Sequence, residues 1–240
     1  MGIITQQQGS FLQIDNASVR ETVQSTLDKL GLDFTLTSKA RSVRRTLPDG
    51  SRSDGFRLYD TYHLGYEMQG PVGEHMRACL RIQDSSVPGM AFRLNLGVFR
   101  LICLNGCFGF GDTFATRVIH RSGPMAEGAL RDLPQAIEFA LQGLPALSAA
   151  AQDLAAIHVQ DPALVVEQLQ IPEGVRGRVL YLLERSAYRA EDRPSTAWGL
   201  YNLVNEVDRL MARKGSTSFL ERDEGLAEQV VALATAQVAA

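Results

Sequence analysis

The sequence predicts an α+β protein, with an antiparallel, partly bulged β-sheet in the N-terminal half and a mostly helical C-terminal half packed on it. Three observations predict this class. Several segments before residue 121 alternate apolar and polar residues with the period of two that strands show. After Gly123 and Pro124 the apolar residues recur at helical spacing. Because the strands precede the helices instead of alternating with them, the order indicates α+β architecture and not repeated βαβ units.

Three parts are expected along the 240 residues. Residues 1–18 are polar and rich in glutamine, which is typical of an arm or an added edge strand. Residues 19–214 are expected to form one α+β domain, sheet-rich over 34–121 and helical over 125–214. Residues 215–240 are expected to form a C-terminal helix. A chain of this length with 45% hydrophobic residues can bury one sizeable core, or one core with a smaller satellite.

Local signals place the first elements. A helix is predicted over residues 19–31, because Ser18 can cap it, Glu21 stands at capping-box spacing and Gly31 can end it. Residues 48–50, Pro-Asp-Gly, predict the turn of a hairpin. Strands are predicted over residues 34–45, 58–68, 76–83, 90–98 and 117–121, and the second arm of the hairpin resumes at residue 56.

Residues 90–114 are the most apolar and glycine-rich stretch, and they join the two halves. Apolar residues alternate up to Val98, which predicts a strand with one buried face. The apolar parity changes after Gly97, which indicates a bulge or a bend. A short buried helix over residues 98–104 is the alternative, since a short apolar run does not distinguish the two. In either case Asn105-Gly106 is typical of a turn.

The C-terminal half is predicted to be helical. Helices are expected over residues 133–160, 162–170, 174–190, 195–213 and 218–237. Pro145 predicts a kink or a break in the first of them. In the fourth helix the spacing predicts a buried stripe of Leu200, Leu203, Val207 and Leu210.

Two motifs resemble signatures of a known family. The first is FRLNLGVFRLICLNGCFGFGDTF, followed by His120, and the second is TAWGLYNLVNE at residues 196–206. In this order they resemble the core motifs of the domain of unknown function 932 family, which phages and plasmids carry. The resemblance covers residues 19–214. Many members of the family have an Asn-Ser-His-Asp-Gly turn before the first motif, whereas this chain has IQDSSVPG at residues 82–89.

The resemblance implies a genetic context instead of an activity, because the activity of the family is unassigned. That context is a mobile element, a phage or a plasmid. The matching positions are motif residues that could carry a function. They are Asn105, Asp112, His120, Trp198, Asn202 and Glu206.

Charge is unevenly distributed along the chain, whose net charge is −3. Residues 1–122 carry +3 and residues 123–240 carry −6. A local surplus of +4 lies between Lys39 and Arg57, which can attract phosphate, and a solvated basic hairpin is the equally weighted alternative. The candidate nucleic-acid-binding residues are Lys39, Arg41, Arg44, Arg45, Arg57, Arg93 and Arg100.

Two of these candidates have a structural alternative. Arg93 and Arg100 suit phosphate and stacked bases, but arginines in so apolar a stretch also favour pairing with carboxylates such as Asp112 or Glu206. The row of Trp198, Asn202 and Glu206 could likewise present a flat ligand surface. The favoured interpretation is that Trp198 packs under the sheet and Asn202 satisfies backbone groups there.

Motifs for metal and nucleotide chemistry are weak in this chain. Cys103 and Cys107 with His120, and with His63 or His75, form the metal-like set of the sequence, but no second ligand pair supports it. Asp60, Asp112, Glu206 and His120 could form a magnesium-dependent nuclease site, although no local motif brings them together. The chain has no GxxxxGK[ST], no GxGxxG after a strand and no GxSxG. No metal and no cofactor is therefore predicted.

Non-enzymatic binding of single-stranded nucleic acid, in replication or recombination of a phage or plasmid, is the leading prediction. The first alternative is a metal-dependent hydrolase that acts on nucleic acid or nucleotides. The second is a counter-defence or regulatory factor that binds a host or phage protein through its acidic helical half. A homo-oligomer is compatible with each. The absence of a membrane-length apolar run and of a secretory pattern, with three apolar-flanked cysteines, predicts a cytoplasmic protein without a membrane partner.

Overall fold

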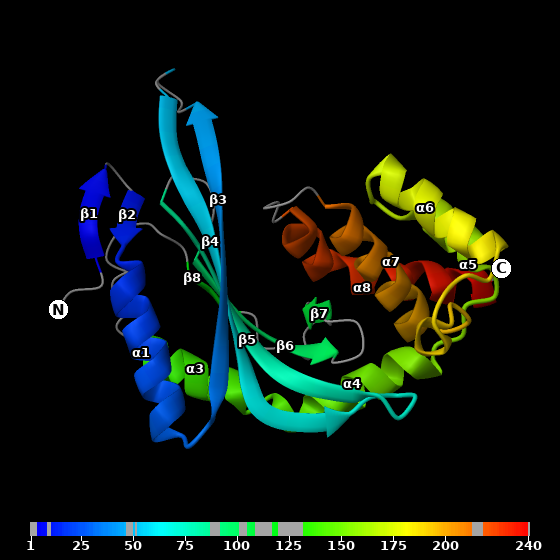
Figure 1. The fold of residues 1–240 in the computed structure, drawn as a ribbon, viewed down its shortest axis with the longest axis horizontal. Helices are drawn as coiled ribbons and strands as arrows, with labels where there is room; N and C mark the ends of the chain where they lie inside the picture. The colour runs from blue at the N-terminus through cyan, green and yellow to red at the C-terminus, as the bar shows by residue number, and fades with distance from the viewer. Residues whose placement is uncertain are drawn as a thin grey trace. The chain divides into compact units, whose positions relative to one another are not determined.

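The structure is a computed structural model, and it confirms the α+β class (Figure 1). It describes residues 4–8, 11–46, 50, 52–86, 92–100, 105–108, 117–119, 132–212 and 218–239. Strands dominate the described chain up to residue 119, and helices dominate it from residue 132 on. The chain divides into two compact units. The first unit comprises Met1–Tyr66, Cys79–Leu96 and Ala115–Leu144, and the second comprises Glu67–Ala78, Gly97–Phe114 and Pro145–Ala240.

The strands form two sheets. A two-stranded antiparallel sheet pairs β1 (Ile4–Gln8) with β2 (Phe11–Ile14), so the predicted N-terminal arm contains a hairpin. The main sheet has the order β3-β4-β5-β6-β7, and β8 also pairs with β6. Its strands are β3 (Phe34–Thr46), β4 (Arg52–Gln69), β5 (His75–Ser85), β6 (Phe92–Arg100), β7 (Asn105–Phe108) and β8 (Arg117–Ile119). The chain passes between the two units within β4, β5 and β6.

In the first unit the helix α1 (Asn16–Lys29) starts earlier than predicted. Asp15, and not Ser18, is the N-cap, because the Asp15 carboxylate accepts hydrogen bonds from the backbone N–H groups of Ala17 and Ser18. The Ser18 hydroxyl bonds to the same carboxylate, which lowers the pKa of Asp15. Gly31 follows the helix with a φ of +67°, a conformation in which glycine carries no steric cost.

The core of the first unit lies between the sheet, α1 and α3 (Leu133–Leu141). Even-numbered positions of β4, β5 and β6 supply most of its apolar side chains from the sheet, as the period of two predicts. Arg20 of α1 bonds to Asp60 of β4 through Nε at 2.6 Å and Nη2 at 2.9 Å, which ties the helix to the sheet. The buried apolar side chains include Val19, Val23, Leu27, Leu58, Tyr62, Leu64, Leu80, Ile82, Phe92, Leu94, Leu133 and Ile137.

The stretch that joins the two halves is more regular than predicted. β6 continues through Gly97 to Arg100, and its register with β7 advances one residue at a time from Gly97 opposite Phe108 to Arg100 opposite Asn105. The helix alternative is therefore wrong for residues 98–100, and this register has no bulge. Asn105 and Gly106 form the start of β7 instead of a turn, because they pair with Arg100 and Phe99. Residues 101–104 lie outside the described part of the chain.

The helices of the second unit largely match the predicted segments. They are α4 (Leu144–Ala156), α5 (Pro162–Gln168), α6 (Glu173–Glu184), the 3₁₀ turn η2 (Ala190–Asp192), α7 (Ala197–Met211) and α8 (Ser218–Ala239). The break predicted near Pro145 occurs between α3 and α4, and this proline lies in the first turn of α4, where its missing N–H is not needed. Among the described helices, none has the length and apolar character needed to cross a membrane.

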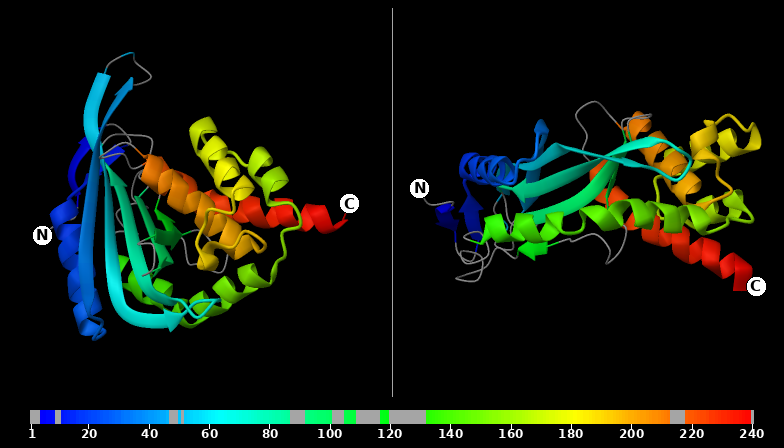
Figure 2. Two further views of the ribbon diagram at one scale, coloured as in Figure 1. Left: turned by 45° about the vertical axis from the view of Figure 1, so that its right-hand side comes forward. Right: turned by 90° about the horizontal axis from the view of Figure 1, so that it is seen from below.

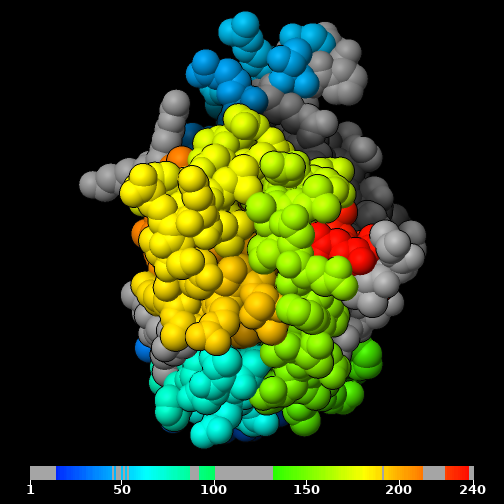
Figure 3. All heavy atoms as spheres, turned by 90° about the vertical axis from the view of Figure 1, so that its right-hand side faces the viewer, coloured from blue at the N-terminus to red at the C-terminus, as the bar shows by residue number. Residues whose placement is uncertain are grey.

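The helix α7 is central to the second unit, and it packs against α6, α8, η2 and β7 (Figure 2). Leu200, Leu203 and Val207 are buried as predicted, but Leu210 is 65% exposed and does not belong to the core. Figure 3 shows one face of this unit, where α4, α5 and α6 lie with the β4–β5 connection. Almost every side chain of α7 before residue 209 is buried, so this helix has a core position on more than one face.

Candidate functional site

The hairpin of β3 and β4 is the exposed basic element that the sequence singled out. We call its residues 39–57 the basic hairpin. β3 and β4 pair in continuous register from Phe34 opposite Leu64 to Thr46 opposite Arg52. The distal end extends past the ends of the other strands of the first unit (Figures 1 and 2). Between residues 39 and 57 every described side chain is exposed or half-buried. The ribbon therefore offers its side chains to solvent.

The cations of the basic hairpin differ in their surroundings. Lys39 and Arg52 are exposed, and Arg41 and Arg57 are half-buried and directly opposite each other across the two strands. Arg44 is exposed and donates from Nε to Asp54 Oδ1 at 2.8 Å, which raises the pKa of Arg44. Such an exposed ion pair is screened by solvent and contributes little to stability. Arg45 is described by its backbone position alone, opposite Ser53.

Arg93 and Arg100, the two candidates in β6, do not lie on this exposed surface. Arg93 is half-buried in the first unit. Arg100 is in the second unit and has 0% exposure. A guanidinium without exposed surface cannot reach a phosphate group of a bound ligand, so Arg100 is removed from the candidate contact residues. The alternative, pairing with carboxylates, describes Arg100 correctly.

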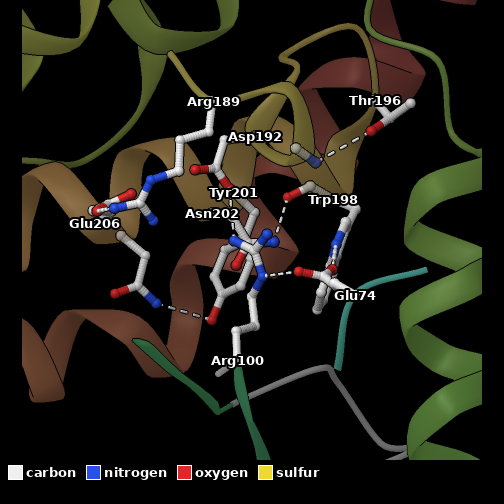
Figure 4. A network of polar contacts seen from close by, with 11 residues as sticks. Glu74, Arg100, Arg189, Asp192, Thr196, Trp198, Tyr201, Asn202 and Glu206 are labelled. Carbon is white, nitrogen blue, oxygen red and sulfur yellow. Dashed lines mark hydrogen bonds and ion pairs between the residues drawn. The ribbon is translucent and has the colours of Figure 1, made fainter. Parts of the chain in front are cut away.

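The carboxylates that pair with Arg100 are not the ones that the sequence suggested. Arg100 Nε donates to Glu74 Oε2 at 2.5 Å, and its Nη1 donates to Asp192 Oδ1 at 2.6 Å (Figure 4). Glu74 precedes β5, and Asp192 ends η2. Both carboxylates are almost fully buried. Of the two expected partners, Glu206 pairs elsewhere and Asp112 lies outside the described residues.

Trp198 completes this buried network. Its side chain is 1% exposed, and its indole Nε1 donates to Glu74 Oε1 at 2.7 Å. The guanidinium carbon of Arg100 lies 5.7 Å from the centre of the Trp198 ring, within the range of a cation–π contact. One carboxylate of Glu74 thus accepts from both Trp198 and Arg100, and the prediction that Trp198 is a packed, internal residue is confirmed.

Local geometry at the start of α7 fixes the position of Trp198. Thr196 is the N-cap, and its hydroxyl accepts a hydrogen bond from the N–H of Gly199 at 3.1 Å. A Cβ at Gly199 would stand 1.9 Å from the carbonyl oxygen of Arg193, so only glycine lets the chain approach this closely. Asn202 is buried, and its Nδ2 donates to the carbonyl of Trp198 at 2.8 Å. This hydrogen bond stays within α7.

Glu206 lies at the border of the network and faces a groove. Arg189 Nη2 is 3.0 Å from Glu206 Oε1, and the Glu206 side chain is 12% exposed. Burial raises the pKa of Glu206, the charge of Arg189 opposes this, and Asp192 raises it further. The groove has a volume of about 500 Å³ and lies within the second unit. Its lining includes Arg178, Leu182, Tyr188, Leu203, Leu210 and Met211.

The candidate metal and nuclease sets receive no support from the described residues. Among these, no group of three or more histidine, cysteine, aspartate or glutamate side chains could hold a metal ion. Asp60 is hydrogen-bonded to Arg20, and Glu206 is paired with Arg189. Cys103, Asp112 and His120 lie outside the described residues, and of Asn105 and Cys107 only the backbone in β7 is described.

Sequence reasoning missed Glu74 and Asp192, the partners of Arg100. Neither acid belongs to a motif: Glu74 directly precedes β5, and Asp192 ends η2 a short loop before α7. One signal was available at Gly70. A Cβ on Gly70 would stand 2.4 Å from Glu74 Cγ, so the glycine leaves the space that Glu74 fills. A glycine four positions before an acid, in a tight connection between strands, can therefore indicate a buried acid.

Comparison of the chain with models of known families, with curated proteins and with solved structures gives no match. The resemblance to the domain of unknown function 932 family therefore stays a prediction.

Proposed function

We propose that the protein binds nucleic acid, single strands in particular, through the basic hairpin, as an accessory protein of a phage or plasmid. One observation carries the proposal. Six of the residues from Lys39 to Arg57 are cations, two are acids, and the described side chains between them are exposed or half-buried on a ribbon that extends from the first unit. A polyanionic backbone gains from each such cation through the release of its counterions.

The buried motif residues of the second unit have a structural role in this proposal. Trp198, Asn202 and Arg100 are buried and hydrogen-bonded within the second unit. Substitutions that remove these contacts would disturb the packing around α7 and would not remove a side chain that a ligand can reach. The proposal therefore assigns binding to the hairpin and architecture to the motif residues of the buried network.

The proposal is tested by fluorescence anisotropy of a labelled single-stranded oligonucleotide and of the matching duplex, across a salt series. We expect saturable binding of the single strand that weakens as salt rises, with log K falling by about 0.7 per phosphate contact for each unit of log salt. The double substitution Arg41→Ala and Arg57→Ala should weaken it about tenfold or more and reduce this slope. Flat titrations for both nucleic acids at low salt would refute the proposal.

Binding of a protein partner is a second candidate function, and the groove beside Glu206 favours it. Leu210 and Met211 line this groove and are 65% and 47% exposed. Exposed apolar side chains beside a charged pair are typical of sites where proteins bind. With the protein immobilised on a column, the variant Leu210→Glu should fail to retain a partner protein that the wild type retains. If the variant and the wild type retain the same proteins, this candidate function is contradicted.

A further inference from the structure

The strand register shows that the surplus charge of the basic hairpin lies on one face. In a strand, successive side chains point to opposite faces, and directly paired residues point to the same face. Lys39 pairs with Tyr59, Arg41 with Arg57 and Arg45 with Ser53. The odd-numbered positions of β3 and β4 therefore share one face, and the even-numbered positions share the other.

The two faces differ strongly in charge. The face with odd numbers, which we call the Arg41 face, has its positions at residues 39, 41, 43, 45, 53, 55, 57 and 59. Four of these eight positions hold Lys39, Arg41, Arg45 and Arg57, and none holds an acid. The opposite face holds Arg44, Arg52 and Asp54, and the first of these pairs with the last. Almost the whole local surplus thus belongs to the Arg41 face.

At the centre of the Arg41 face two arginines stand directly opposite each other. Side chains at directly paired positions have Cβ atoms about 5 Å apart, and like charges there destabilise the pairing. The neighbouring pair on this face is Val43 with Gly55, and Gly55 has no side chain that would block an approach to Arg41 and Arg57. Two adjacent guanidinium groups next to a glycine, which has no side chain, are well suited to hold one phosphate group between them.

From this arrangement we infer that the Arg41 face is the phosphate-binding surface, with one phosphate of a single strand between Arg41 and Arg57 and a neighbouring one at Lys39. The inference rests on the proposed function and gives it a location and a ligand class. A hairpin inserted into a duplex groove meets phosphates on both walls and would use cations on both faces. A single strand has one backbone, which matches a ribbon with most of its cations on one face.

The substitution Arg57→Glu tests the inference, with Arg44→Glu as a matched control. Both change the net charge of the hairpin equally, but the first acts on the Arg41 face and the second on the opposite face. Arg57→Glu should weaken binding of a single-stranded oligonucleotide about tenfold or more, and lower its salt slope by about 1.4, because it removes one contact and engages Arg41. Arg44→Glu should weaken binding by about threefold at most.

Thermal unfolding separates this effect from a loss of fold. Arg57→Glu places opposite charges across the strands, so its melting temperature should stay equal to that of the wild type or rise. If it falls, the neutral variant Arg57→Gln replaces it in the same titrations. Equal losses in both Glu variants, or a wild-type preference for duplex, would overturn the inference but not nucleic-acid binding. A wild-type protein that binds neither nucleic acid would overturn the proposed function itself.

Discussion

For Arg100 the sequence predicts that the side chain forms an ion pair, but it does not predict which carboxylates are the partners. A cation in an apolar stretch must pair, and this could be inferred from the sequence. Its partners lie 26 and 92 positions away, at Glu74 and Asp192, and no local pattern marks them. The same limit applies to Trp198, whose burial was predictable from its helix and whose bond to Glu74, 124 positions away, was not.

Replacing Arg100 with methionine should strongly destabilise the protein. The substitution leaves Glu74 and Asp192 buried without the guanidinium that both now contact. Loss of one partner from a buried ion pair typically lowers the free energy of unfolding by about 3–5 kcal/mol. Urea unfolding of the two proteins measures this difference. Arg77→Met, which breaks a more exposed pair with Glu67 in the same unit, is the control and should change stability far less. Equal effects of both substitutions would contradict the account.

Glu206 should make stability depend on pH. Because its pKa is raised in the folded protein, the folded state holds this proton more tightly than the unfolded state does. Its contribution is therefore greatest below the ordinary pKa of a glutamate, near 4.5, and is lost as pH rises through the folded pKa. Relative to the wild type, Glu206→Gln should gain melting temperature on going from pH 4.5 to neutral pH. A difference in melting temperature between the variant and the wild type that stays constant across this pH range would contradict this assignment.

At the scale of elements, local chemistry made the hairpin and most helices predictable. The Pro-Asp-Gly turn and the alternation in β3 place both arms of the hairpin close to where the structure has them. β6 was predicted to be irregular at Gly97, because Phe99 and Leu101 change the apolar parity. The strand continues because Arg100 keeps the buried parity of Val98, which its distant carboxylates make favourable. Charged residues with long-range partners thus mislead a rule based on hydrophobic periodicity.

The register of β3 with β4 is a second feature that composition alone does not give. The sequence indicates a basic segment, but only the pairing of Arg41 with Arg57 assigns both to one face. A shift of one residue would move Arg57 to the other face.

Two glycine-to-alanine substitutions in helices should have opposite effects. Gly199→Ala puts a Cβ 1.9 Å from a backbone oxygen of Arg193, so the start of α7 must shift, at a cost of about 1–3 kcal/mol or more. Gly177→Ala, within α6, meets nothing within 4 Å and should stabilise the protein by about 0.5–1 kcal/mol. Thermal melts of both variants check this pair of expectations, and a Gly199→Ala variant as stable as the wild type would refute the close approach.

For the whole molecule, the α+β class follows from the order of strands and helices, but the division into two units does not. Three strands of the main sheet each contribute residues to both units. A boundary within a strand has no composition shift, proline or linker that a sequence could reveal. The single domain over residues 19–214 therefore stays a prediction.

Because β4, β5 and β6 continue from one unit into the other, we expect the protein to unfold in one cooperative transition. Trp198 is the single tryptophan of the chain and is buried in the second unit, so its fluorescence reports on that unit. Far-UV circular dichroism reports on the whole chain. Urea curves from the two probes should coincide, as two-state unfolding requires. Separate midpoints would show that the units unfold independently.

Phosphate binding by the Arg41 face is tested directly by the salt-dependent titration of labelled single-stranded DNA with the wild-type protein and with Arg57→Glu. We expect binding that weakens steeply with salt in the wild type, and about tenfold weaker binding with a smaller salt slope in the variant. Wild-type curves that stay flat at low salt, or a variant that binds as the wild type does, would contradict the assignment of nucleic-acid binding to the Arg41 face.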